Sequence, residues 1–477
     1  MVQLNPPTDA VDQGAVANSN TAAETVSALE RVARQRDFFA TGQTRSRQFR
    51  EAQLQKLKQA IEAHEDAILS ALHKDLGKPE FESFATEVTA KNDVDYALKH
   101  LKRWMSPRRV STPLTLKPGR AYQQPEPLGV TLIISPWNYP FQLGIVPLIG
   151  AIAAGNCAIL KPSEISPHTS ALLAKLLSDT FDPDHIAVVE GDAQTSQALL
   201  AQKFDHIFFT GSTHIGRIVM KAAAEHLTPL TLELGGKSPC IVDANINLEV
   251  TAKRIVWGKF INAGQTCIAP DYLLVDQRIK SDLLNQIKQT VTDFYGDNPQ
   301  TSPDYGRIVS DRHFQRLTGL ISGDVIVGGG HHDGDRYIAP TVIDSVTAEH
   351  PAMAEEIFGP ILPVVAYDNL EEAIAFINAR PKPLAAYIFS KDKAVQQQIL
   401  QQTSSGGVCI NDTIKQVAIP DLPFGGVGDS GMGAYHGQAS FDTFSHLKGV
   451  FKRPFWLDLP LLYPPYGDKL NFLKKAL

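Results

Sequence analysis

The sequence has few cysteines, and their spacing does not predict any pairing. Its 477 residues include four, with no CxxC pair and no Cys/His spacing typical of a metal site: Cys157, Cys240, Cys267 and Cys409. A disulfide framework is therefore not expected. We expect a reducing, cytoplasmic compartment instead. The 14 histidines include no HExxH motif. The one adjacent pair, His331-His332, lies in a run of glycines and aspartates typical of a solvated loop, so no metal site is predicted.

The sequence also lacks an excess of positive charge and a long apolar run. Its net charge is −6, whereas a nucleic-acid-binding domain is usually basic. No uncharged apolar run reaches the roughly 20 residues that a membrane span needs. The longest, residues 143–154, contains glycines and a proline and predicts a buried helix.

The two ends of the chain differ from the rest in composition. The first twenty residues contain no Arg, no Lys and no apolar core, so a secretory signal is not expected. Residues 1–23 are predicted to be a disordered extension. The tail, residues 451–477, mixes aromatic residues, prolines and lysines. We expect it to pack on the protein's own surface or on a second subunit, with a weak peripheral membrane contact as the alternative.

Strands and helices alternate from residue 130 onward. Apolar strands are predicted at 130–134, 157–160, 186–189 and 206–209, separated by helices at 142–154, 167–180 and 193–202. This order predicts an α/β fold with a parallel, doubly wound, Rossmann-like sheet, which binds ligands at the carboxyl ends of its strands. With the helical residues 24–105, residues 129–236 would form a cofactor-binding domain.

The α/β alternation continues in the second half of the chain. A strand at 240–242, a helix at 247–262, a strand at 272–275 and a helix at 278–294 predict a second α/β domain over residues 237–424. Between the predicted helices and the first strand, residues 106–128 contain five prolines. They predict an extended arm or hairpin outside the core.

Cys267 and Glu233 are the residues with the clearest chemical potential. A thiol can attack a carbonyl carbon and hold the acyl group as a thioester, and a carboxylate can activate the water that releases it. Taken alone, each has a simpler interpretation: free cysteines are usually small buried hydrophobes, and a Glu between leucines can pair with a cation. Gly235, Gly236 and Gly264 lie beside them and allow the close backbone approach that a crowded site requires.

Two further segments could bind a nucleotide. Gly211 and Ser212 follow a predicted strand and begin a helix, where free N–H groups can bind phosphate. The spacing to Gly216 is Gly-x-x-x-x-Gly and not the dinucleotide fingerprint, so a capped helix start explains it equally well. Lys161 and Glu164 follow another strand and could hold a ribose; a surface loop with two solvated charges is the alternative.

Seven short runs between residues 136 and 426 resemble the aldehyde dehydrogenase superfamily and occur in that family's order. They are Pro136-Trp137-Asn138-Tyr139-Pro140, Lys161-Pro162-Ser163-Glu164, Phe209-Thr210-Gly211-Ser212, Glu233-Leu234-Gly235-Gly236-Lys237, Gly264-Gln265-Thr266-Cys267, Glu355-Glu356-Ile357-Phe358-Gly359-Pro360 and Pro423-Phe424-Gly425-Gly426. The run that follows, residues 427–437, is similar to the class 3 branch, which includes fatty-aldehyde dehydrogenases.

The resemblance implies roles for the matched residues. Cys267 would be the nucleophile and Glu233 the general base, while the side chain of Asn138 and the N–H of Cys267 would form the oxyanion hole. The remaining matched residues would bind the cofactor. Lys161 and Glu164 would hold the adenosine ribose, with Trp137 lining the cofactor cleft nearby. Gly211 and Ser212 would meet the pyrophosphate, with Gly216 permitting close helix packing. Glu356 would hold the nicotinamide ribose, and Phe358 would pack near the nicotinamide.

Substrate, cofactor choice and assembly are expectations of the same kind. Tyr139 and Trp257 are candidates for the wall of an access tunnel, although both could be core aromatics. Class 3 resemblance implies medium- or long-chain aliphatic, or aromatic, aldehydes and a homodimer joined through residues 106–128 and 425–450. Glu164 favours NAD because its carboxylate repels a 2′-phosphate, while Lys161 could offset this and allow some use of NADP.

Two rival functions remain open from the sequence. A CoA-acylating aldehyde dehydrogenase shares the nucleophile, but it does not need Glu233 as a hydrolytic base. A non-catalytic scaffold could reuse the fold, because fold does not fix function. Such a scaffold needs none of Cys267, Glu233 and Asn138.

Overall fold

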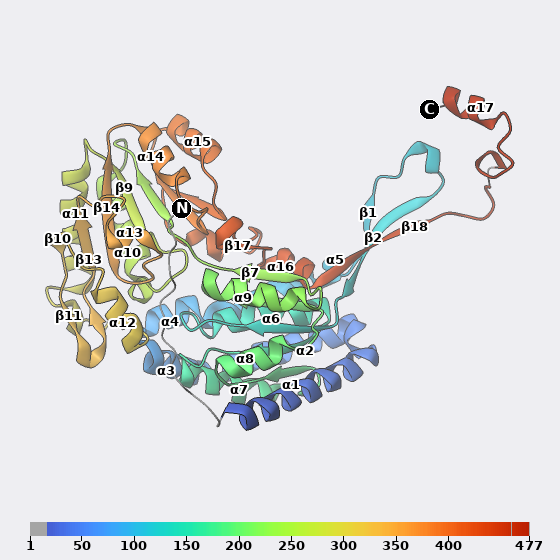
Figure 1. The fold of residues 1–477 in the computed structure, drawn as a ribbon, viewed down its shortest axis with the longest axis horizontal. Helices are drawn as coiled ribbons and strands as arrows, with labels where there is room; N and C mark the ends of the chain where they lie inside the picture. Colours follow the sequence, from blue (N-terminus) through green and yellow to red (C-terminus); the bar gives the residue numbers. More distant parts are fainter. Residues whose placement is uncertain (1–16, 459, 477) are drawn as a thin grey trace, which may run out of the picture.

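The computed structural model describes residues 17–458 and 460–476 (Figure 1). The first sixteen residues of the predicted disordered extension lie outside this range. Residues 17–23 do not fit the prediction, since they begin helix α1 (Ala17–Ala40). The alanines in this stretch favour helix, and α1 buries Ala28 and Val32 further along.

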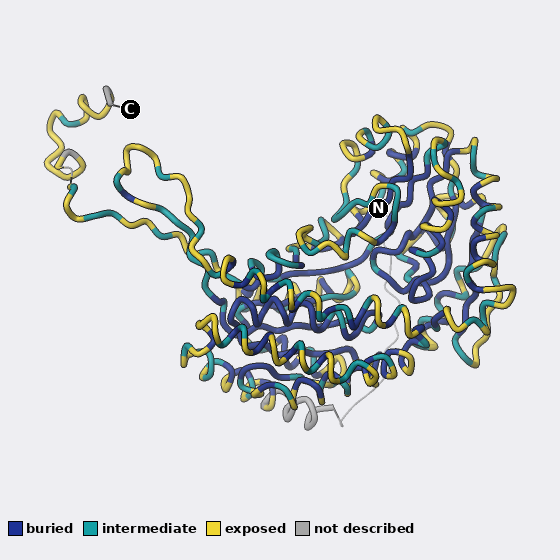
Figure 2. Tube along the Cα trace, turned by 180° about the vertical axis from the view of Figure 1, so that it is seen from behind, coloured by how far each residue is buried: buried dark blue, intermediate teal, exposed yellow. Residues whose placement is uncertain are grey.

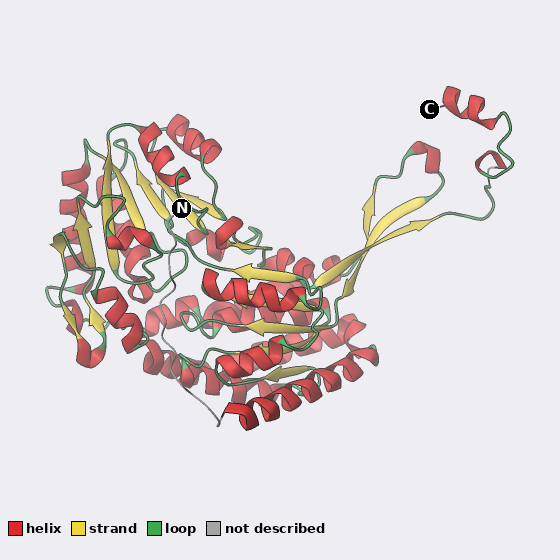
Figure 3. Cartoon of the chain, viewed as in Figure 1, coloured by secondary structure: helices red, strands yellow, loops and turns green. Residues whose placement is uncertain are grey.

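The first sheet has six strands in the order β17-β7-β6-β3-β4-β5. Its strands are β3 (Val130–Ile134), β4 (Cys157–Lys161), β5 (Ile186–Val188), β6 (His206–Thr210), β7 (Leu230–Glu233) and β17 (Gly431–Met432). All neighbours are parallel except β17, which pairs antiparallel with β7. Helices cover both faces (Figure 3), which is why β3 and β4 are buried along their whole length. The predicted strands and the parallel sheet are confirmed.

The helices of this part match the sequence prediction closely. They are α6 (Gln142–Ala154), α7 (Pro167–Thr180), α8 (Ala193–Leu200) and α9 (Thr213–Ala224). Helix α7 begins at Pro167 as predicted, but the Ser166 side chain does not cap it. Asp75 does so instead, because its carboxylate accepts the N–H groups of His168 and Thr169 (3.0 and 2.8 Å).

The helical region before the first strand is also confirmed. After α1 it contains α2 (Arg47–Ala63), α3 (Glu65–Leu76), α4 (Glu80–Thr86) and α5 (Lys91–Trp104). Apolar residues at helical spacing, such as Leu54, Leu57 and Ile61, are fully buried. They form one core with α6 and α7, so these helices pack on the first sheet.

The second sheet has seven strands in the order β10-β13-β14-β9-β8-β15-β16. These are β8 (Pro239–Val242), β9 (Tyr272–Asp276), β10 (Asp324–Val327), β13 (Thr341–Asp344), β14 (Ile361–Tyr367), β15 (Ala385–Phe389) and β16 (Gly407–Ile410). Only β10 is antiparallel to its neighbour. Its helices are α10 (Leu248–Phe260), α11 (Lys280–Tyr295), α12 (Asp311–Thr318), α13 (Pro351–Ala354), α14 (Leu370–Asn378) and α15 (Lys393–Gln402). His331 and His332 form the short exposed strand β11, which pairs with β12 (Tyr337–Ile338).

A three-stranded arm projects from the body (Figures 1 and 2). Strands β1 (Arg108–Val110) and β2 (Arg120–Pro127) form the predicted hairpin, and β18 (Ser445–Lys452) pairs with β2 over its whole length. Helix α16 (Gly437–Thr443) leads into β18. Most residues of the arm are exposed or half-buried, as Figure 2 shows.

The tail does not pack on the body as expected. Strand β18 runs outward along the arm, so the tail starts at the distal end and continues to α17 (Lys469–Ala476). Phe455 and Trp456 are 103% and 76% exposed. The tail therefore does not cover the body of its own chain, and the expected contact with a second subunit stays a prediction. Within the described residues, no helix is both long and apolar enough to cross a membrane.

Candidate active site

Cys267 sits on a tight loop after helix α10. The loop begins with Asn262, Ala263 and Gly264, whose φ values of 53°, 50° and 73° are all left-handed. A Cβ at Gly264 would lie 2.3 Å from the carbonyl oxygen of Gly359, so glycine is required there. The loop leaves the Cys267 side chain half-buried at the wall of a cavity.

This cavity brings four of the predicted site residues together. It has a volume of about 710 Å³ and is lined by Cys267, Glu233, Tyr139 and Trp257. Most of its remaining wall is apolar and was not predicted, including Leu143, Ile268, Leu384, Ile414, Val417, Phe424 and Tyr435. Exposed lining residues near α4 and α5, such as Phe81, Asn92 and Lys99, mark its opening.

Glu233, the last residue of β7, is an unusual buried carboxylate. It is 2% exposed, and neither side-chain oxygen has a hydrogen-bond partner among the described residues. Burial raises its pKa well above the ordinary range, so the group holds its proton more readily than an exposed carboxyl does. Because an unpaired buried carboxyl is costly, its presence beside a thiol points to chemistry and not to packing.

The pKa of the Cys267 thiol is also raised, which favours its neutral form. Burial, followed by the nearby carboxylates of Glu356 and Glu233, raises the pKa of the thiol. The proton must therefore leave as the sulfur attacks, or be taken by a neighbouring base. Glu233 lines the same cavity as the sulfur, and it is one of the two carboxylates close enough to raise the pKa of the thiol.

Asn138 is buried close to the Cys267 loop, but among the described residues it is not part of the cavity wall. Its Nδ2 donates to the carbonyl oxygen of Gln265 (3.0 Å), two residues before Cys267. A side-chain amide has two N–H donors, so one is left for a developing oxyanion. Its place beside Cys267 agrees with the predicted role without testing it.

The predicted pyrophosphate residues lie at the N-terminus of α9. Ser212 caps this helix by accepting the N–H of Ile215 (3.4 Å), and Gly211 separates it from β6. A Cβ at Gly216 would come within 2.8 Å of Leu234, so this glycine permits the close packing that was predicted. Ile215 and Ile218, one turn apart, expose apolar surface beside the helix start. A helix terminus and an apolar face fit a dinucleotide.

Lys161 is the last residue of β4, and Glu164 follows this strand at the same edge of the sheet. Lys161 is 2% exposed, and its Nζ donates to Glu164 (3.2 Å) and to the carbonyl oxygen of Pro162 (2.7 Å). The alternative of two solvated charges is therefore wrong for Lys161. The half-exposed Glu164 side chain is free to meet a ribose hydroxyl.

The remaining cofactor residues meet near the loop after β7. The carboxylate of Glu356 packs on Gly235, where an added Cβ would lie 2.2 Å from it. Burial, and then Asp271, raise the pKa of Glu356 to about 8. Phe358 and Trp137 form an edge-on pair with ring centres 5.3 Å apart, and both are half-buried. His313 of α12 contacts both rings and was not anticipated.

Comparison with known proteins places this geometry in a family. The sequence profile of the aldehyde dehydrogenase family matches residues 3–450. The chain belongs to the aldehyde dehydrogenase family. It is 51% identical over 442 residues to the 4,4'-diaponeurosporen-aldehyde dehydrogenase of Staphylococcus aureus, covering 92% of this chain and 96% of that one. It is 50% identical over 417 residues to the dimeric NADP-preferring aldehyde dehydrogenase of Rattus norvegicus, covering 87% and 92%.

Solved structures agree with the fold. The substrate-bound state of Staphylococcus aureus AldH superposes with a TM-score of 0.92 at 48% identity, covering 94% of this chain and 98% of that chain. An indole-3-acetaldehyde dehydrogenase in complex with NAD+ gives a TM-score of 0.83 at 27% identity, covering 90% and 89%. This aldehyde dehydrogenase is therefore an oxidoreductase that acts on aldehydes with NAD or NADP as cofactor.

Proposed function

We propose that this aldehyde dehydrogenase oxidises medium- or long-chain apolar aldehydes to free carboxylic acids. Cys267 acts as the nucleophile and Glu233 as the hydrolytic base. One observation supports this most directly: both side chains line the same cavity of about 710 Å³, whose remaining wall is mainly apolar. An alkyl chain can be desolvated there while its carbonyl carbon lies beside the thiol.

The residues support an ordered reaction. The Cys267 sulfur adds to the aldehyde carbon and its proton passes to solvent. N–H groups of Asn138 and of the Cys267 backbone stabilise the oxyanion that forms. A nicotinamide bound at this site would supply a hydride acceptor, and the acyl group would then remain on the Cys267 sulfur as a thioester. Glu233 then takes a proton from the water that attacks this thioester. The acid leaves and the Cys267 thiol is restored.

The proposed substrate class predicts a chain-length dependence. Across straight-chain aldehydes from two to twelve carbons, kcat/KM should rise with length, because each buried CH₂ contributes about 0.8 kcal/mol. Reduced cofactor and free acid should form in equal amounts without CoA, measured by absorbance and by mass spectrometry. A strict need for CoA would establish the acylating rival. A flat length dependence would refute the apolar substrate class and leave aldehyde oxidation itself intact.

We also propose a cytoplasmic homodimer that uses its tail at membranes. Strand β18 is an edge strand of the arm, and an unpaired edge is a template for a second chain. The exposed tail combines Trp456 and Phe472 with Lys469 and Lys474, as membrane-surface segments do.

Deleting residues 456–477 should remove the membrane contact of the tail and leave the dimer contact of the arm. We expect light scattering to give twice the 52.1 kDa chain mass for both the full and the shortened protein, because the arm is intact. Flotation with vesicles rich in anionic lipid should recover the full chain and not the shortened one. Equal flotation of the two would exclude a membrane role for the tail, and a monomer mass for the full chain would exclude the dimer.

A further inference from the structure

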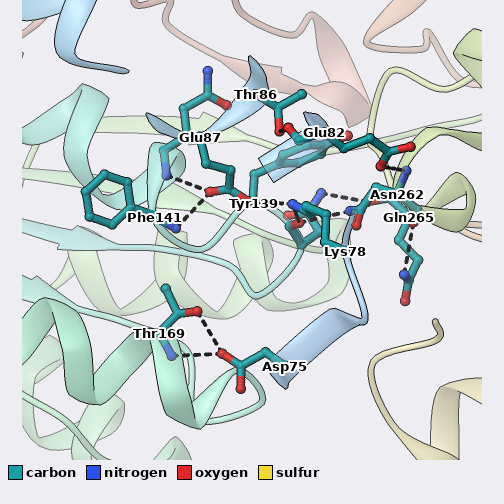
Figure 4. Close-up of polar contacts among 12 residues, drawn as sticks. Asp75, Lys78, Glu82, Thr86, Glu87, Tyr139, Phe141, Thr169, Asn262 and Gln265 are labelled. Atoms are coloured by element: carbon teal, nitrogen blue, oxygen red, sulfur yellow. Dashed lines mark hydrogen bonds and ion pairs between the residues drawn. The ribbon is translucent and has the colours of Figure 1, made fainter. Parts of the chain in front are cut away.

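A buried ion pair lies next to the candidate active site without being part of the cavity wall. The side chains of Lys78 and Glu87 are both 0% exposed, and the Lys78 Nζ donates to Glu87 Oε1 at 2.5 Å (Figure 4). Both come from the segment that contains α4, far from Cys267 in sequence. Replacing a buried pair by apolar groups is often neutral for stability, so the pair calls for another explanation.

The pair binds the turn that carries Asn138. The Lys78 Nζ also donates to the carbonyl oxygen of Asn138 (3.1 Å) and lies 4.2 Å from the centre of the Tyr139 ring. The second oxygen of Glu87 accepts the N–H groups of Phe141 and Gln142 (3.1 and 2.9 Å), where α6 begins. One segment therefore holds the chain from the carbonyl group of Asn138 to the start of α6. Figure 4 shows Lys78 and Glu87 beside Tyr139 and Phe141 of this turn.

The other contacts of Asn138 come from the nucleophile loop. Asn262 Nδ2 donates to the carbonyl oxygens of Asn138 (2.9 Å) and Gln265 (3.2 Å). Glu82, also from α4, accepts the backbone N–H of Asn262 (2.9 Å) and holds it in its left-handed conformation. The position of the Asn138 amide relative to Cys267 thus depends on contacts with α4 and its flanks.

We infer that Lys78, together with Glu87, is a positioning residue for the Asn138 amide. The inference rests on the proposed role of Asn138 as an oxyanion donor. Such donors must lie about 2.7–3.1 Å from the oxyanion, and a misplacement of about 1 Å can cost roughly 100-fold in rate. Lys78 holds the Asn138 peptide in place and does not itself touch the aldehyde.

The test is a double-mutant cycle on the first turnover. The variant Lys78→Met with Glu87→Gln removes the charges as a pair, so that no unpaired ion is left buried. At saturating aldehyde and NAD, its rate of first-turnover NADH formation should fall about 10- to 100-fold. In an Asn138→Ala background the same pair of changes should cost less than about threefold, because the group being positioned is already absent.

Arg50→Met is the matched control. Arg50 is a buried cation that donates to the carbonyl oxygen of Ala153 at the other end of α6 (3.0 Å). The Arg50→Met substitution should lower the melting temperature and leave the first-turnover rate within about twofold of the parent rate. If the pair variant does not fold, Lys78→Gln alone, checked by circular dichroism, takes its place in the cycle.

The possible results distinguish a failure of the positioning role of Lys78 from a failure of the oxyanion role of Asn138. If Asn138→Ala itself leaves the first turnover unchanged, the oxyanion role of Asn138 fails. A second result is that Asn138→Ala slows the first turnover while the pair variant lowers the rate by the same factor in the parent and in the Asn138→Ala background. In that case the positioning role of Lys78 is refuted and the oxyanion role of Asn138 stands. A loss that appears only in the parent background supports both.

Discussion

Replacing Cys267 by alanine abolishes aldehyde oxidation and leaves the protein folded. We expect kcat to fall by roughly 10⁴-fold or more, the scale seen when the nucleophile of a covalent mechanism is removed. Cys267 is half-buried at the cavity wall, and its loop is held by backbone contacts and by Gln265, not by the thiol. Its removal should therefore have little effect on stability.

The measurement is steady-state NADH formation, with circular dichroism as the check on folding. Cys409→Ala is the matched control, because Cys409 is also half-buried and lies on β16, outside the cavity wall. It should keep parental activity. Turnover by Cys267→Ala above a tenth of the parental rate would eliminate covalent catalysis at this residue.

Replacing Glu233 by glutamine has a different expected result. Thiol addition and hydride transfer remain, while thioester hydrolysis loses its base, so steady-state turnover should fall about 10²- to 10⁴-fold. Stopped-flow absorbance should then show a burst of about one NADH per active site before the slow phase. Loss of both phases together would contradict the assignment of Glu233 to hydrolysis alone.

The raised pKa of Glu233 also predicts the direction in which the rate of thioester hydrolysis changes with pH. Burial raises the pKa of Glu233, and a base acts only when it is ionised. The hydrolytic step of the parent enzyme should therefore speed up as pH rises above the range in which an ordinary carboxyl group ionises. In Glu233→Gln the residual slow phase should lack this rise, because an amide does not titrate in that range. A parent rate that falls with rising pH would contradict the base.

The elements that the sequence predicted most accurately are those set by local signals. The strand at 130–134 and the helices at 142–154 and 167–180 have their predicted bounds, because an apolar run or a proline at a helix start is a short-range feature. Cys267 and Glu233 come from different strand–helix units. Their pairing was implied by the family resemblance, and the shared cavity shows that they meet.

What could not be predicted depends on contacts between distant segments. Asp75 caps α7 from 93 residues away in the chain. Lys78 donates a hydrogen bond to Asn138, which lies 60 residues further along the chain. No local pattern marks a lysine or an aspartate for such a partner. The place of the tail depends on the direction of β18, which carries the tail's apolar residues away from the body and is not marked by any local pattern.

The most direct test of the account is to look for the acyl group on the protein. Glu233→Gln is mixed with NAD and decanal, quenched in acid after the burst, digested and analysed by mass spectrometry. The account predicts a decanoyl thioester on the peptide that contains Cys267 and on no other cysteine-containing peptide. A decanoyl group on Cys157, Cys240 or Cys409, or a burst of NADH without any acylated cysteine, would contradict the proposed role of Cys267.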